Sequence, residues 1–477
     1  MALNFIANAA VRSASGRTLA VIDPADGQPY ESLERSDAAD VDAAVQAARQ
    51  ALEGAWSKRT ATERGRLLSQ LGAKVAQHAE ELAAIEQRDC GKPTRQARAD
   101  ALALARYLEF YGGAADKLHG QTIPYLDGYS VLTWREPHGV TGHVVPWNYP
   151  MQIFGRSVGG ALAAGNACVV KPSEDACLSL LRVAELAAEV GFPAGVLNIV
   201  TGYGHEVGDA LARHPGVDHI SFTGSPRVGT LIQQAAAERH CPVTLELGGK
   251  GPQIVFADAD VDAALPFLVN AIVQNSGQTC SAGSRLLVQR ALYEPLLERL
   301  GVAFRALRAG PPAMDLDLGP LIRQSQCERV HGFLQQAQAD GIAVVATGQV
   351  VEQASATGFY VAPTLLRDVP SQHRLAQEEI FGPVLAAMCF DDEDHAVGLA
   401  NGTPFGLVAG IWTRDGGRQL RMARRVRAGQ VFINNYGAGG GVELPFGGSG
   451  ASGYGREKGF EALYGFTTLK TVAIRHD

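Results

Sequence analysis

Short apolar runs alternate with amphipathic segments of helical length from residue 166 onward, and this alternation limits the folds open to the chain. Such runs predict buried strands joined by helices, the pattern of a parallel sheet with right-handed crossovers. Ligands bind these sheets beyond the carboxyl ends of the strands, so the residues after each strand are candidates for a site. The predicted strands cover residues 167–171, 196–200, 217–222 and 243–247.

A second set of strands and helices begins at residues 252–256 and continues to about residue 450. One core stops growing at roughly 250–300 residues, so a chain of 477 residues predicts two large domains of the α/β class. The first third is predicted to be helical. We expect Ser36 to cap one helix, and Thr60 and Glu63 to form a capping box at the start of the next.

Charge and cysteine usage exclude several classes of protein. The net charge is −7 with no long run of one sign, so nothing indicates a nucleic-acid partner. Seven widely spaced cysteines without a C-x-x-C pair argue against a disulfide scaffold or a zinc site and favour a reducing compartment. The N-terminus lacks the apolar core of a signal peptide, and no window holds the ~18 apolar residues of a membrane span. We therefore expect a cytoplasmic protein without a membrane partner.

Cys280 lies in a polar, glycine-rich segment, QNSGQTCSAGSR, although free cysteines usually pack as small apolar residues in cores. Small neighbours would give a substrate access to this thiol. Backbone N–H groups of a tight turn would lower its pKa and bind a developing oxyanion. A small residue in a packed loop is the alternative.

Two other polar residues lie where they could assist a nucleophile. Glu246 ends the strand at 243–247 between two leucines, and apolar neighbours raise the pKa of a carboxyl group and suit it as a general base. Asn148, in VVPWNYP, could donate its amide N–H to an oxyanion. An ordinary strand-edge glutamate and a turn asparagine are the alternatives.

The turns after two predicted strands are candidate nucleotide contacts. Lys171 and Glu174, in KPSE, lie where a ribose would bind, and a carboxylate there accepts ribose hydroxyls and repels a 2′-phosphate. Gly224 and Gly229, in TGSPRVG, flank the start of a helix, whose N-terminus favours anionic oxygens. Solvated side chains and a plain strand-to-helix turn are the alternatives.

These motifs follow one order along the chain: PWNYP, KPSE, FTGSPRVG, LELGGK, GQTC, EEIFGPV and PFGGSGASGYGRE. As a set they resemble the NAD(P)-dependent aldehyde dehydrogenase superfamily over nearly the whole length of the chain. The resemblance implies a Rossmann-like NAD-binding domain (1–117 and 138–248), a second α/β domain for catalysis (249–451) and a β-flap (118–137 and 452–477). Family members form dimers or tetramers through such flaps.

The resemblance also assigns roles to single residues. It implies that Cys280 attacks the aldehyde, that Asn148 and the cysteine's own N–H bind the oxyanion, and that Glu246 activates the water that hydrolyses a thioester. It implies NAD as cofactor, favoured over NADP by Glu174, and no metal. The implied cofactor contacts are Trp147, Lys171, Glu174, Gly224, Ser225, Gly229, Glu379 and Phe381.

Three positions depart from the family's pattern. Ser157 and Gly450 stand where lysines are common, and Arg156 stands where a bulky apolar or aromatic residue is common. The chain resembles succinic semialdehyde dehydrogenases in having Arg156, and a guanidinium can bind a substrate carboxylate bidentately. We therefore expect Arg156, with Tyr149, to contact a carboxylated semialdehyde. An Arg156 that pairs with a protein carboxylate is the equal alternative.

Other functions remain open at this point. The substrate could be a neutral aliphatic or aromatic aldehyde under a broad specificity. The thioester could pass to coenzyme A, although relatives that do this generally lack the glutamate found here at 246. A binding protein without catalysis, or a simple nucleotide-binding module, fits less well because Cys280, Glu246 and Asn148 are all present.

Overall fold

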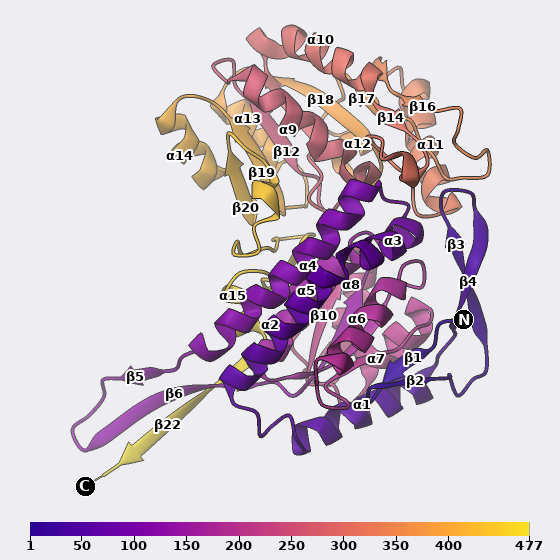
Figure 1. Ribbon diagram of the computed structural model, residues 1–477. Helices are drawn as coiled ribbons and strands as arrows, with labels where there is room; N and C mark the ends of the chain where they lie inside the picture. Colours follow the sequence, from indigo (N-terminus) through magenta and orange to yellow (C-terminus); the bar gives the residue numbers. More distant parts are fainter. Residues whose placement is uncertain (477) are drawn as a thin grey trace.

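The computed structural model describes residues 1–476, the side chains of 438 and 439 excepted, as two α/β units and a projecting arm (Figure 1). The first unit is built on an 8-stranded sheet, whose central strands β9, β8, β7, β10 and β11 run parallel, as predicted. In sheet order the strands are β2 (Ala9–Val11), β1 (Asn4–Ile6), β9 (Leu197–Ile199), β8 (Ala167–Pro172), β7 (Val140–Val145), β10 (His219–Thr223), β11 (Val243–Glu246) and β21 (Gly453–Tyr454).

Helices cover both faces of this sheet, because its strands are apolar on both sides. In β8, Ala167 and Val169 belong to one core, while Cys168 and Val170 belong to the other. The first face is covered by α1 (Ala38–Glu53), α7 (Asp209–Arg213) and α8 (Pro226–Ala237). The second is covered by α2 (Ala61–Gln77), α3 (Ala79–Cys90), α4 (Thr94–Ala114), α5 (Pro150–Ala164) and α6 (Leu178–Glu189).

One of the two predicted helix caps is confirmed and the other is wrong by one residue. Thr60 and Glu63 form the capping box of α2. At α1 the N-cap is Asp37, with Asp40 bonding back to it, because the buried Ser36 hydroxyl accepts a hydrogen bond from Asn4 at 2.7 Å instead. Ser36 and Asp37 are adjacent and could each cap the helix, and the contact of Ser36 with Asn4 leaves Asp37 as the cap.

The second unit holds a 7-stranded sheet that is parallel except at β15. Its order is β15 (Val344–Thr347), β17 (Thr364–Leu366), β18 (Val384–Phe390), β13 (Arg285–Gln289), β12 (Pro252–Val255), β19 (Val408–Trp412) and β20 (Gln430–Ile433). One face packs on α9 (Val261–Val273) and α10 (Arg290–Ala306). The other packs on α11 (Gln324–Ala339), α12 (Arg374–Gln377), α13 (Glu393–Asn401) and α14 (Gly416–Arg425). The predicted α/β class is thus confirmed.

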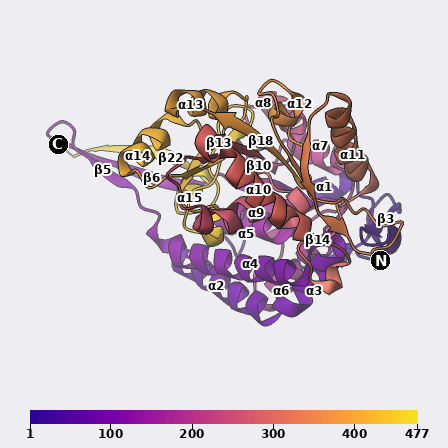
Figure 2. The same cartoon turned by 90° about the horizontal axis from the view of Figure 1, so that it is seen from above.

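The arm is an antiparallel sheet that projects from the first unit in both views (Figures 1 and 2). Its order is β22 (Thr467–Arg475), β6 (Tyr129–Pro137) and β5 (Gln121–Ile123). Residues 452–466, which we assigned to the flap, lie elsewhere. There β21 extends the first sheet and α15 (Glu461–Gly465) packs on α5. Gly453 permits this, since a Cβ there would lie 2.0 Å from the carbonyl oxygen of Leu245.

Two small sheets complete the fold. They pair β3 (Thr18–Asp23) with β4 (Gln28–Glu34), and β14 (Arg308–Ala309) with β16 (Gln349–Val350). No helix of residues 1–476 has the length and apolar character needed to cross a membrane.

Candidate active site

The predicted site residues of the first unit lie along one edge of its sheet. The chain runs from β7 outward to β8 and β9 and then returns to β10 and β11 on the other side, so the strand order reverses between β7 and β10. Ligands bind at such a reversal, beyond the carboxyl ends of the strands. The residues at or just after these ends are Trp147 and Asn148 (β7), Lys171 and Glu174 (β8), Gly224 and Ser225 (β10), and Glu246 (β11).

Cys280 lies just after a tight left-handed turn that follows α9. Asn275, Ser276 and Gly277 all have positive φ, at 48°, 55° and 77°. Such backbone is uncommon outside glycine and asparagine, and a Cβ at Gly277 would lie 2.2 Å from the backbone of Gly382. The side chain of Asn275 holds the turn by donating to the backbone carbonyl of Asn148 at 2.8 Å.

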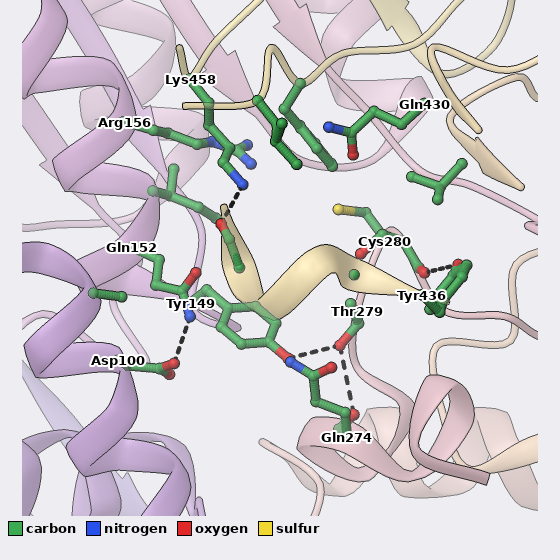
Figure 3. Close-up of a pocket in the computed structure, with 18 of the residues that line it drawn as sticks. Asp100, Tyr149, Gln152, Arg156, Gln274, Thr279, Cys280, Gln430, Tyr436 and Lys458 are labelled. Atoms are coloured by element: carbon green, nitrogen blue, oxygen red, sulfur yellow. Dashed lines mark hydrogen bonds between the residues drawn. The ribbon is translucent and has the colours of Figure 1, made fainter. Parts of the chain in front are cut away.

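Two further polar contacts join the segment around Cys280 to the segment after β7. The Asn148 amide donates to the carbonyl of Gln278 at 3.0 Å, and the Tyr149 hydroxyl bonds Thr279 Oγ1 at 2.9 Å. Asn148, Tyr149 and Cys280 all line a cavity of ≈ 470 Å³, into which the Cys280 thiol points (Figure 3). The predicted nucleophile and oxyanion donor are therefore brought together. Among residues 1–476 no hydrogen bond uses the Cys280 backbone N–H.

Electrostatics keep the thiol neutral in the free protein. Burial raises the pKa of Cys280 to about 12, while the positive charge of Arg156 and the backbone N–H of Ser281 act in the opposite direction. At neutral pH the sulfur is therefore protonated, and its proton must be removed as it attacks a carbonyl carbon.

Glu246 is buried, with 1% of its surface exposed, and neither of its carboxylate oxygens has a hydrogen-bond partner in the described part of the chain. Burial raises the pKa of this carboxyl well above its usual range, and the negative charge of Glu457 adds to the shift. A Cβ at Gly447 would lie 2.8 Å from Oε1, so the PFGG glycine leaves room for the carboxylate. Buried polar groups are nearly always satisfied, which marks Glu246 as a functional candidate, although it does not line the cavity.

Predicted cofactor residues from two segments, the one after β7 and the one before β18, lie near Cys280. The Glu379 carboxylate accepts a hydrogen bond from the Gly249 backbone N–H at 3.0 Å, and a Cβ at Gly249 would lie 2.3 Å from the Cys280 carbonyl oxygen. The rings of Trp147 and Phe381 meet edge to face, with centroids 5.4 Å apart. Glu379 thus holds the Gly249 backbone that packs directly against Cys280.

The residues after β8 and β10 hold polar groups suited to a ribose and a diphosphate. Buried Lys171 pairs with Glu174 at 2.9 Å. Burial raises the pKa of Glu174, but the Lys171 charge outweighs it and the net shift is downward, so Glu174 stays ionised. Ser225 is the N-cap of α8 and accepts from the N–H of Val228 at 3.4 Å.

The two glycines of TGSPRVG are explained by packing. A Cβ at Gly224 would lie 2.6 Å from the ring of Phe222, and one at Gly229 would lie 2.6 Å from Leu247. We expected these positions to be glycine so that the backbone could approach a diphosphate. Close contacts with neighbouring side chains supply a sufficient reason.

Arg156 lines the cavity but is paired with a protein carboxylate, the alternative that we weighed equally. Its Nε lies 2.5 Å from Oε2 of Glu457, its Nη2 donates to Thr223 at 3.2 Å, and its Cζ lies 4.9 Å from the centroid of the Phe446 ring. Its guanidinium is therefore largely committed before any substrate arrives. The sequence offered no sign of Glu457 as the partner.

The other two departures have local causes. The Ser157 hydroxyl donates to the Ile153 carbonyl of its own helix at 2.9 Å. Gly450 has φ +61°, and a Cβ there would lie 2.5 Å from the Pro404 carbonyl oxygen, so a lysine would not fit this backbone.

Several residues of the site escaped sequence reasoning. Glu457 is one of them. Two others line the cavity: Tyr436, whose hydroxyl donates to the Ser281 carbonyl at 2.5 Å, and Lys458. No motif marked either residue, because their positions depend on how the glycine-rich segment 434–455 folds. No group of three or more His, Cys, Asp or Glu side chains in the described residues could hold a metal ion.

Comparison with known proteins agrees with this geometry. The model of the aldehyde dehydrogenase family matches residues 11–472. The chain is 41% identical to an aldehyde dehydrogenase of Aspergillus niger over 99% of this chain and 94% of that one.

Solved structures are also similar to this chain over its whole length. A crystal structure from Burkholderia cenocepacia shares 72% identity and a TM-score of 0.99, with both chains covered to 100%. PnpE from Pseudomonas sp. WBC-3, solved in complex with nicotinamide adenine dinucleotide, shares 41% identity and a TM-score of 0.97, over 100% of this chain and 98% of that one. The chain therefore belongs to the aldehyde dehydrogenase family.

Proposed function

We propose that the protein oxidises an aldehyde to a carboxylic acid with NAD, through a thioester on Cys280. One observation carries the proposal. The Cys280 thiol points into a cavity also lined by Asn148, while a buried carboxylate without partners, Glu246, ends a neighbouring strand.

The chain's own residues can perform each step. Sγ of Cys280 bonds to the carbonyl carbon as its proton passes to solvent water. The amide of Asn148, with one N–H used by Gln278, has a second N–H for the resulting oxyanion, together with the free backbone N–H of Cys280. After oxidation, Glu246 takes a proton from water, the water oxygen bonds to the thioester carbon, and the Cys280 thiolate leaves.

The residues at the strand ends fit NAD. When bound, NAD accepts the hydride that leaves the aldehyde carbon. Ionised Glu174 suits ribose hydroxyls and disfavours a 2′-phosphate, Ser225 lies at the N-terminus of α8, and Glu379 lies beside Cys280. The NAD-bound structure of PnpE supports this assignment.

We also propose that the physiological aldehyde carries a carboxylate, as in succinic semialdehyde. Two cationic side chains, Arg156 and Lys458, line the cavity together with the nucleophile. A neutral aldehyde under a broad specificity is the competing proposal, since aromatic side chains also line the wall, among them Tyr107, Tyr149, Phe267, Phe432 and Phe446.

The test is NADH formation with a panel of aldehydes. We expect turnover without coenzyme A, and a loss of at least about a thousandfold in Cys280→Ala. Cys241→Ala, which removes another half-buried thiol, is the matched control. Turnover that survives in Cys280→Ala would refute the mechanism, and NADH formation that requires coenzyme A would replace hydrolysis with acyl transfer.

We also propose that the protein assembles through its arm and functions in the cytoplasm. The arm exposes apolar side chains on an open-edged sheet, which supports a homodimer or homotetramer formed through it. These side chains include Ile123, Tyr125, Leu126, Trp134, Leu469 and Ile474. All seven cysteines are unpaired, which supports a reducing compartment such as the cytoplasm.

A further inference from the structure

Three charged side chains line the cavity that holds the Cys280 thiol: Asp100, Arg156 and Lys458. Two of them are neutralised by protein partners. Asp100 forms an ion pair with buried Lys92 and accepts a hydrogen bond from Gln152. Arg156 forms its pair with Glu457.

Lys458 is the third charged residue of the cavity wall, and no carboxylate of the described residues pairs with it. Within residues 1–476 its ammonium makes one hydrogen bond, to the carbonyl oxygen of Gly440 at 2.6 Å, and no ion pair. Glu443, the acidic side chain whose charge acts on it, is bound to Arg106 instead. An ammonium has three donors, so two remain for a ligand.

The backbone holds Lys458 in a position that few side chains adopt. Its φ is +61°, and it stands between the buried Glu457 and Gly459, whose φ is also positive at +59°. A lysine in this region is strained, and such strain gathers at functional sites. Here it accompanies a side chain on the cavity wall, 5.9 Å from the same Phe446 ring that Arg156 faces.

The setting of Lys458 favours an anion. Burial and the like charge of Arg156 together lower the pKa of this lysine to about 8. The ammonium is still mainly protonated at neutral pH, but it is short of solvent and close to a second cation. A carboxylate at this point would relieve both effects.

We propose that Lys458 binds the carboxylate of the substrate whose aldehyde reacts at Cys280, and that Arg156 stays paired with Glu457. The inference rests on the proposed function, and it assigns the substrate's anionic end to a residue that no motif marked. The charge of Arg156 is already balanced by Glu457, so Arg156 attracts a substrate carboxylate less than Lys458 does.

The experiment measures selectivity for charge. We would determine kcat/KM for linear semialdehydes from succinic to adipic and for their methyl esters, which keep the chain and mask the charge. The expected result is a preference of wild type for the acids, with an acid-to-ester ratio that falls at least tenfold in both Lys458→Met and Lys458→Gln. Lys458→Arg should retain most of the ratio, because it keeps the charge.

Lys58→Met is the matched control, since it removes an equal charge from an exposed turn. It should leave the ratio as in wild type. A ratio that stays constant in the Lys458 variants, or a wild type that prefers the esters at every chain length, would overturn the inference while NAD-dependent oxidation stood. Failure of wild type to oxidise any acid or ester would refute the proposed function itself.

The pH dependence supplies a readout that a structural role would not move. The groups that face Lys458 are Arg156 from α5, Glu443 from the preceding loop, and Cys280. None of them changes charge near pH 8, because the pKa of Arg156 is raised, that of Glu443 is lowered, and that of Cys280 is raised to about 12. KM for the acids should therefore rise as pH rises through about 8, while KM for the esters should not follow. Equal profiles for acids and esters would contradict the role.

Discussion

The Nε of Arg156 lies 2.5 Å from Oε2 of Glu457, and both side chains are buried beside the cavity. The other carboxylate oxygen of Glu457 accepts a hydrogen bond from the Ser221 hydroxyl at 2.5 Å. This pair therefore ties α5 and β10 to the C-terminal segment that follows the glycine-rich loop. It fixes one wall of the substrate cavity with charges that cancel.

Removal of one partner should cost more than removal of both. We expect Glu457→Gln to destabilise the protein by about 3–5 kcal/mol, because it leaves a buried guanidinium without its counter-ion. The double variant Arg156→Met/Glu457→Gln should recover a large part of that loss. Chemical unfolding followed by fluorescence measures both. Equal stability of the single and double variants would show that the pair carries no coupling.

Glu246 should govern the second half of the reaction. Glu246→Gln should lower steady-state turnover by about a hundredfold or more, while a burst of NADH remains, since the amide cannot deprotonate water for hydrolysis of the thioester. Rapid mixing followed at the NADH absorbance resolves the burst. A variant with no burst would place Glu246 in the first step instead.

The direction of the Glu246 pKa shift sets the pH profile. Burial raises this pKa, and hydrolysis needs the ionised carboxylate, so kcat of wild type should increase as pH rises through the raised value and then level off. Measured at saturating aldehyde, this rise should be absent in Glu246→Gln. A wild-type kcat that falls over the same range would contradict the assignment.

The sequence predicted much of this site, because local patterns carry it. Apolar runs located β8, β10 and β11, and the residues at their carboxyl ends followed from the parallel topology. Cys280 stood out because a thiol rarely sits among Gly, Ser and Thr. These signals are local, and tertiary packing left them unchanged.

Other features depend on contacts between distant segments, which no single-chain pattern contains. Arg156 and Glu457 are separated by most of the chain, so the pair could be stated only as an alternative. Lys458 follows a glycine-rich segment with no periodicity, and its place on the wall depends on a left-handed backbone. At α1, Ser36 and Asp37 were equally good caps until Asn4 engaged the serine.

Glu174 should set the choice of cofactor. Glu174→Gln removes the negative charge that a 2′-phosphate would meet, while Lys171 remains to attract it. We expect kcat/KM for NADP relative to NAD to rise about tenfold or more. Glu185→Gln, on the exposed side of α6, is the control. An unchanged ratio would mean that other groups exclude the phosphate.

Three buried or half-buried histidines should make the first unit sensitive to acid. The rings of His138 and His219 stack at 4.9 Å, and His143 lies nearby on β7. Burial lowers the pKa of His143 to about 3 and also lowers those of His138 and His219. In the unfolded chain these groups take up protons near pH 6.5, so the native state loses stability as pH falls below that value.

His143→Leu tests this dependence. Each such histidine contributes a slope of about 1.4 kcal/mol per pH unit below its unfolded pKa, so the variant should show a shallower loss of stability between pH 6 and 5. Denaturant unfolding at several pH values measures it, with the exposed His119→Leu as control. Equal slopes in wild type and His143→Leu would refute a contribution of His143 to the acid sensitivity.

The arm should control assembly without touching the catalytic residues. β22 pairs with β6 along nine residues, from Thr467 opposite Pro137 to Arg475 opposite Tyr129, and leaves its outer edge open. Trp134 and Leu469 are 49% and 56% exposed there. An open edge beside exposed apolar side chains is what a second copy would cover.

We therefore expect Leu469→Asp to shift the mass measured by light scattering toward the monomer. Leu420→Asp makes the same change at an exposed leucine of α14 and should leave the mass unchanged. A wild type that is already monomeric would refute assembly through the arm.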